Sequence, residues 1–246
     1  LSNNDIYLQD NAANGNYDHD VAGIGRVNST NQQTDSRGSG IVRISNATNL
    51  GNDEFLLWGH NNGTLGTWGV ADRPTGVQGR WGRVWRMNEV SSSGAVIDVG
   101  NVDVSFDLTG FTVASASHLR LLVDLNNNGI FADDTPISGA TAIGGGLYRF
   151  SGVSSFGNNI RFTLGTTDLS QTPLPIELLN FEAHGEGDGH VRLDWATASE
   201  QNNEEFTVER SLDGMVWQEV VKVPGAINSS QLLHYSAMDA HATGPV

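Results

Sequence analysis

Apolar and polar residues alternate in short segments along the whole chain, and this period-2 pattern predicts β-strands. In Val102–Leu108, for example, every second residue is apolar and the residues between are polar. Gly, Asn, Asp and Ser bound these segments and predict turns. Before residue 166 the predicted strands are Asp5–Gln9, Val21–Arg26, Gly40–Ser45, Glu54–Trp58, Gly82–Met87, Val96–Gly100, Val102–Leu108, Leu119–Asp124, Gly146–Phe150 and Asn159–Leu164.

The same pattern predicts the fold class. No segment carries the apolar stripe of an amphipathic helix, so we expect an all-β protein with little helix. Short strands at this spacing favour a large β-sandwich with jelly-roll-like connections over residues 1–165. Residues 166–173 are predicted to form a short, stiff linker, because Pro173 and Pro175 restrict the backbone around Leu174.

Residues 174–246 carry a second set of alternating segments, which predicts a separate sandwich of the fibronectin-III or immunoglobulin kind. Such a sandwich takes about seven strands, so this domain lacks its last two. Either the chain is cut before them, or a partner supplies them by donor-strand complementation. An open sheet edge would otherwise promote aggregation. The predicted strands are Ile176–Ala183, His190–Ala196, Glu205–Arg210, Val216–Val223 and Leu232–Ala237.

The composition is that of an acidic chain without cysteine. Its 246 residues carry a formal net charge of −15, which would repel nucleic acids and argues against binding them. Without Cys the chain forms no disulfide, no thiolate metal site and no Cys nucleophile. No apolar run is long enough for a transmembrane helix. The chain starts without Met or a signal peptide, so we expect it to begin within a longer precursor.

Three motifs of the second domain, Leu174–Leu179, Trp195–Glu200 and Phe206–Gly214, resemble the fibronectin-III-like domain of Bacteroidota surface proteins. In those proteins the domain precedes the C-terminal signal of the type IX secretion machinery. The resemblance implies a location outside the cell or on its outer surface. It also implies core positions for Trp195 and Tyr235.

Three motifs of the first domain are similar to an uncharacterised domain of large Bacteroidota surface proteins. They are Asp20–Arg26, Asp53–Gly63 and Gly82–Arg86. In those proteins this domain often comes directly before the fibronectin-III-like module. The resemblance implies a family and an order of domains, and it implies no activity.

The best candidate for an ion site is the loop between Asp124 and Asp134. Its first half reproduces the D-x-N-x-N-G pattern of calcium loops, in which alternate residues turn their oxygens inward. Thr135 stands where an EF-hand has its bidentate Glu, so we expect a shorter calcium turn, with a plain Asn-Gly hairpin as the alternative. The predicted Ca²⁺ ligands are Asp124, Asn126, Asn128, Ile130 through its carbonyl, Asp133 and Asp134.

Tryptophan is concentrated in one part of the first domain, at Trp58, Trp68, Trp81 and Trp85. Trp58 and Trp85 belong to apolar strand patterns and are expected in the core. Trp68 lies in a Gly-rich loop and is expected to be the exposed member. There it would offer a stacking surface to a sugar.

The sequence favours a non-catalytic function. It contains no G-x-S-x-G elbow, no P-loop and no H-E-x-x-H motif, so we expect no enzyme. The first hypothesis is a secreted cell-surface protein, adhesin-like or structural, exported by type IX secretion. The second is a self-assembling filament or sheath subunit, a homo-oligomer completed by a neighbour's strand. The third is a carbohydrate-binding module that recognises surface glycans through Trp68.

Overall fold

The computed structural model describes residues 5–10, 12–38, 41–172, 177–229 and 231–240. The chain divides into two compact units, Leu1–Thr172 and Pro173–Val246. Strands account for 52% of the structure, and the helices described are two 3₁₀ turns, η1 (Ala12–Asn14) and η2 (Ala116–His118). The all-β prediction is therefore confirmed.

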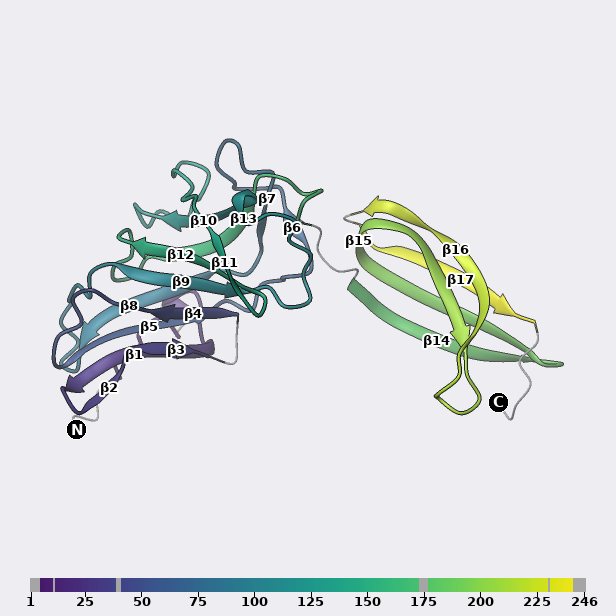
Figure 1. Ribbon diagram of the computed structural model, residues 1–246, viewed down its shortest axis with the longest axis horizontal. Helices are drawn as coiled ribbons and strands as arrows, with labels where there is room; N and C mark the ends of the chain where they lie inside the picture. The colour runs from purple at the N-terminus through teal and green to yellow at the C-terminus, as the bar shows by residue number, and fades with distance from the viewer. Residues whose placement is uncertain (1–4, 11, 39–40, 173–176, 230, 241–246) are drawn as a thin grey trace. The chain divides into compact units, whose positions relative to one another are not determined.

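The first unit is a β-sandwich of two antiparallel sheets (Figure 1). The larger sheet has the order β2-β1-β5-β8-β13-β7-β6, and β10 pairs with β13. The smaller has the order β11-β12-β9-β4-β3. The strands of the larger sheet are β1 (His19–Asn28), β2 (Asn31–Gln33), β5 (Glu54–His60), β6 (Trp68–Gly69), β7 (Gly79–Trp81), β8 (Trp85–Ser91), β10 (Leu119–Asp124) and β13 (Arg161–Thr166); those of the smaller are β3 (Asp35–Arg37), β4 (Val42–Ser45), β9 (Val102–Asp107), β11 (Thr141–Gly144) and β12 (Leu147–Val153).

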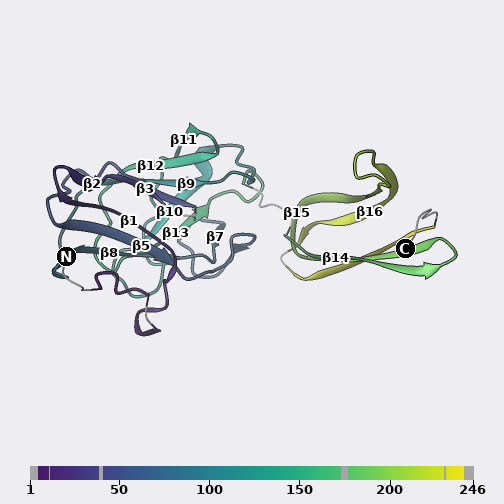
Figure 2. The same cartoon turned by 90° about the horizontal axis from the view of Figure 1, so that it is seen from below.

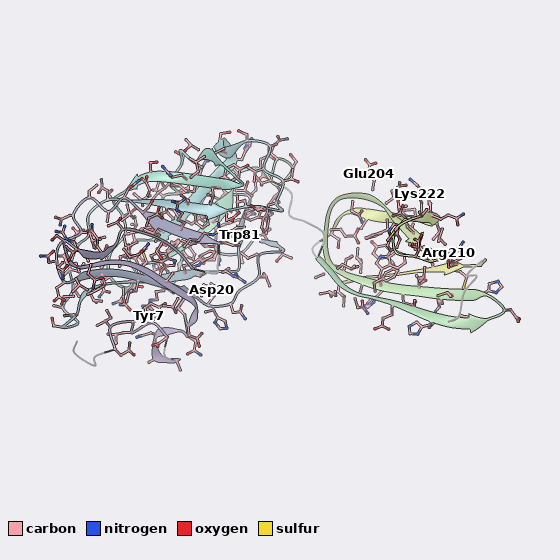
Figure 3. All side chains as sticks on the ribbon, turned by 60° about the horizontal axis from the view of Figure 1, so that its bottom comes forward. Tyr7, Asp20, Trp81, Glu204, Arg210 and Lys222 are labelled. Carbon is pink, nitrogen blue, oxygen red and sulfur yellow. The ribbon has the colours of Figure 1, made fainter. Side chains whose placement is uncertain are left out.

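The core of the first unit lies between these sheets, where alternate residues of each strand point inward. Many of these inward side chains are aromatic. Trp81 is fully buried inside the unit (Figure 3) and stacks on Trp68 with ring centroids 5.7 Å apart. Phe106 of the smaller sheet meets Trp85 edge-on at 5.9 Å. The polar face of β9 is also buried. There Asp103 is satisfied by hydrogen bonds from Asn46 Nδ2 (2.8 Å) and Gly152 N (2.9 Å).

Two of the predicted strands are wrong. Asp5–Gln9 forms no strand; side-chain hydrogen bonds anchor it instead, from Tyr7 Oη to Tyr17 O (2.6 Å) and from Leu8 N to the Asn88 side chain (2.8 Å). Val96–Gly100 is reduced to an isolated bridge between Val96 and Val90. Both segments have strand-like composition, but their backbone groups find partners outside a ladder.

The predicted linker 166–173 starts too early. Thr166 ends β13, and residues 167–172 pack on the first unit. Thr167 N donates to His118 O (2.9 Å), and Thr172 O accepts from the indole of Trp68 (2.8 Å). These bonds fix the segment, and the two units divide between Thr172 and Pro173. Pro173, Leu174 and Pro175 lie outside the described residues.

The second unit contains β14 (Glu177–Gly187), β15 (His190–Arg210), β16 (Gln218–Ser229) and β17 (Leu233–Asp239). The first part of β15 lies between β14 and β17, and its second part pairs with β16. Figure 2 shows β15 curving from one layer into the other.

The predicted strands His190–Ala196 and Glu205–Arg210 are therefore one continuous strand. No Gly or Pro interrupts it. The buried carboxylate of Glu200 accepts from Thr197 Oγ1 (2.8 Å) and Asn203 Nδ2 (2.9 Å), so these three side chains at the bend satisfy one another.

Candidate functional site

The loop after β10 is organised around the carboxylate of Asp124, which is fully buried. Its Oδ1 accepts from Asn128 N and its Oδ2 from Gly129 N, both at 3.0 Å. Arg161, directly opposite on β13, places Nη2 2.5 Å from Oδ2. Gly129 has φ +95°, and a Cβ there would meet the Arg161 guanidinium at 3.2 Å, so this position favours glycine.

The remaining predicted ligands follow in the same loop, on its outer side except for Asp134, which is half-buried. Asn126 Nδ2 (3.2 Å) and Asn128 Nδ2 (2.8 Å) both donate to Asp133, and these bonds hold the pKa of the Asp133 carboxyl below its ordinary value. Asp134 accepts from Leu125 N (3.3 Å), and burial raises its pKa. Ile130 N donates to the side chain of Asn128 (2.8 Å). The sequence thus identified residues that the fold does bring together.

The contacts of Asp124 suit a hydrogen-bonded loop better than a cation. A calcium ion at Asp124 would meet the positive guanidinium of Arg161 at hydrogen-bond distance. Among the described residues, no group of three His, Asp or Glu side chains is placed to hold a metal. An ion would therefore be held by Asp133 together with the Asn126 and Asn128 amides, after both amides turn their oxygens outward. Calcium stays a prediction, and the geometry limits it to this outer side.

Calcium is expected to raise the melting temperature of the first unit only at millimolar concentration, because the outer ligands are exposed and must rearrange. Melting curves with calcium and with a chelator measure the difference. At ten times its Kd, an ion would add about 1.4 kcal/mol. Asp133→Asn should abolish the difference, and Asp168→Asn, which changes a half-buried carboxylate in the turn after β13, should keep it. Equal melting temperatures with calcium and with chelator would contradict the site.

Trp68 is not the exposed indole that its loop predicted. Its side chain is half-buried, its Nε1 donates to Thr172 O (2.8 Å), and one ring face stacks on Trp81 with an interplanar angle of 11°. The loop composition gave a wrong prediction for Trp68 because residues 167–172 fold back onto the loop. Trp68 joins the core cluster, and a sugar would find only its remaining face.

The sequence analysis missed a buried histidine, His60, that pairs with Asp20. His60 is 1% exposed; its Nδ1 accepts from Asn62 N (2.9 Å), so its Nε2 carries the proton and donates to Asp20 Oδ2 (2.9 Å). Burial lowers the pKa of His60. Asp20, labelled in Figure 3, sits at the start of β1 with φ +49°. Both ring nitrogens are engaged, so the pair fixes the strand end and leaves His60 no lone pair for proton transfer.

The second unit has an apolar row that is covered at one end only. Phe181 of β14, Trp195 of β15 and Tyr235 of β17 are in register on one face. Phe206, from the second part of β15, packs on Trp195 (5.5 Å) and Tyr235 (4.9 Å). Phe181 remains 51% exposed, and Leu178, which lies opposite Thr197 on the same face, is 52% exposed. The second layer therefore covers β15 and β17 and leaves the inner face of β14 open.

The strand edge beside this face is also open. Within the described residues, Glu205–Glu209 pair with β16 along one edge and with no strand along the other. The other edge of β16 is placed by its packing against β17 of the first layer, so the free edge of β15 points toward β14. The free edge and the exposed Phe181 and Leu178 thus border one space that would accept further strands. That the second unit lacks two strands stays a prediction.

The comparisons with known proteins give a family and no activity. A family described as a domain of unknown function (DUF8202) matches residues 1–155. No curated protein and no solved structure matches the chain. Within the described residues, no helix has the length and apolar character that crossing a bilayer requires. The match covers more than half of the chain and includes nearly all of the first unit, and the chain therefore belongs to the DUF8202 family.

Proposed function

We propose that the chain is a non-catalytic extracellular protein, adhesive or structural, whose second unit is completed by β-strands from outside the described residues. The observation that carries the proposal is the open space beside Glu205–Glu209, bordered by Phe181 and Leu178. A strand added there would satisfy the free backbone groups of Glu205–Glu209 and cover the exposed apolar residues of β14. Association by strand addition is a function of structural and adhesive proteins.

The proposed location outside the cell, and export by type IX secretion, rest on the motifs of the second unit. Trp195–Glu200 and Phe206–Gly214 resemble a module that precedes the sorting signal of that system. A chain without Cys and with a net charge of −15 is compatible with this environment. Antibody labelling of intact source cells, with and without the secretion machinery, tests the location.

Hydrogen exchange tests strand addition directly. The amides of Glu205–Glu209 that face the free edge are expected to exchange rapidly in residues 1–246 alone. In the native protein recovered from the cell surface they should be strongly protected, because an added strand engages them. Equal exchange in both samples would contradict completion of the sandwich.

Phe181→Ser should weaken this completion by at least about tenfold, because it removes the ring that an added strand would cover. The variant should leave the melting temperature of residues 1–246 nearly unchanged, since Phe181 is already half exposed. Leu212→Ser is the matched control: Leu212 is 79% exposed in the turn after β15 and borders no uncovered face. If both variants affect protection of Glu205–Glu209 equally, the apolar row plays no part.

The open edge also favours the filament hypothesis as a second candidate. In a filament the added strand would come from a neighbouring copy, and the native protein would sediment as polymers. A free adhesive module would sediment as a monomer with its own chain completing the fold. Analytical ultracentrifugation and electron microscopy of the native protein separate the two cases.

A further inference from the structure

Arg26 is a half-buried arginine in a strongly acidic protein. It lies near the end of β1, on the same strand face as the core residue Ile24. Its Nε is buried and has no hydrogen-bond acceptor. Among the described residues, no carboxylate forms an ion pair with it. Leaving a buried donor unsatisfied costs about 1–3 kcal/mol, so the fold keeps this cation at a cost in stability.

Arg26 lines a hollow of about 410 Å³ at the rim of the sandwich. One wall is formed by Gln32 and Thr34, where the chain passes from β2 to β3. The other wall is the connection between β4 and β5, with Thr48 and Asn49. Hydroxyl and amide groups therefore surround the guanidinium, and all of these side chains except Arg26 are exposed at the opening.

The carboxylate nearest to Arg26 in the sheet register is Glu54, which lies opposite it on β5. Glu54 Oε2 accepts instead from Gly51 N at 2.6 Å, which closes the turn that forms the second wall. On the other side of β1, Gln32 lies opposite Arg26 and has no charge. Arg26 thus stands between a carboxylate that is turned to the Gly51 amide and a neutral amide.

We propose that this hollow binds the carboxylate of an acidic sugar, with Arg26 as the anchoring residue. A guanidinium presents parallel donors that match a carboxylate, and such paired charged hydrogen bonds are among the strongest in proteins. The hydroxyls of Thr34 and Thr48 and the amides of Gln32 and Asn49 are the groups that hydrogen-bond sugar hydroxyls. The site belongs to the first unit and is independent of strand addition to the second, so either proposal can fail without the other.

NMR titration of residues 1–246 tests the site, with sodium glucuronate as the probe and with glucose and acetate as comparison ligands at equal ionic strength. Glucuronate is expected to shift the amide resonances of Thr34 and Thr48–Gly51 in a saturable way. Glucose lacks the carboxylate and acetate lacks the hydroxyls, so each should bind at least about tenfold more weakly. Binding of acetate as tight as that of glucuronate would overturn the sugar assignment.

Arg26→Gln should reduce glucuronate affinity by at least about tenfold. Arg120→Gln removes the same charge from β10, away from the hollow, and should leave the affinity unchanged. The melting temperature of Arg26→Gln should be equal to or above that of the parent chain, because no protein ion pair is lost and one unsatisfied donor is removed. A lower melting temperature would show that Arg26 has a partner within the chain and would overturn the proposal.

Gln32→Ala tests glucuronate binding to the same hollow without changing Arg26, so its result does not depend on any effect of Arg26 on folding. Gln32 is exposed on the short edge strand β2, and its loss should weaken glucuronate binding about threefold without affecting the melting temperature. Unchanged affinity in both Arg26→Gln and Gln32→Ala would overturn the site.

Discussion

Replacing Arg161 with methionine is expected to lower the free energy of unfolding of the first unit by about 3 kcal/mol. Arg161 is the cationic partner of Asp124, and the Asp124 side chain has no exposure to solvent. Without the guanidinium, the fold must keep an uncompensated carboxylate beside β10. The loss should fall at the lower end of the range for buried pairs, since the Arg161 side chain is 20% exposed. Urea unfolding measures it.

The matched comparison is Arg43→Met. Arg43 pairs with Asp35 at the surface, where the two side chains are 32% and 45% exposed, so its loss should cost less than about 1 kcal/mol. The double variant Asp124→Leu/Arg161→Met should be more stable than the sum of the two single changes predicts, because it leaves no lone charge. Equal costs for Arg161→Met and Arg43→Met would contradict a buried pair. Because the unfolding experiment needs no added metal, it measures the contribution of the ion pair independently of calcium binding.

The alternating pattern predicted most of the strands because each strand must bury one face. Val102–Leu108 became β9 almost residue for residue. The pattern failed at Asp5–Gln9, a loop segment in which Tyr7 and Gln9 are buried and a few side-chain hydrogen bonds take the place of a strand ladder. It also missed the continuity of β15, because a bend without Gly or Pro leaves no mark in the sequence.

Whether a site residue could be predicted depended on how close its partners are in the sequence. The oxygen-rich loop after β10 was visible because its members are close in the sequence, whereas its cation, Arg161, comes from a distant strand and could be found only through the register. Trp68 was misjudged because its cover, residues 167–172, is also distant in the sequence. That the second unit lacks two strands stays a prediction from counting, whereas the exposure of Phe181 could be seen only in the packing. Arg26 carries no sequence signal, since the lack of a partner is a three-dimensional property.

Glu89→Gln is expected to stabilise the first unit by about 3 kcal/mol at pH 8 and to have little effect at pH 4. Glu89 is 1% exposed and lies on β8 on the same face as the core residues Trp85 and Met87. Its Oε1 has no hydrogen-bond partner. Burial, and then the negative charge of Asp98, raise its pKa from 4.5 to about 7. The folded state thus holds a proton that the unfolded state releases.

The sign of the pH dependence follows from this difference. The stabilisation by protonated Glu89 is complete below pH 4.5, decreases as the pH rises, and is lost above about 7. Glutamine resembles the protonated acid and does not titrate, so the variant should lack this decline. Glu204→Gln, an exposed position of the second unit (Figure 3), should leave the decline in place. Urea unfolding from pH 4 to pH 8 measures all three proteins, and a parallel decline in Glu89→Gln would show that Glu89 is not its source. A carboxyl on the core face would then have found a partner that removes the cost of its charge.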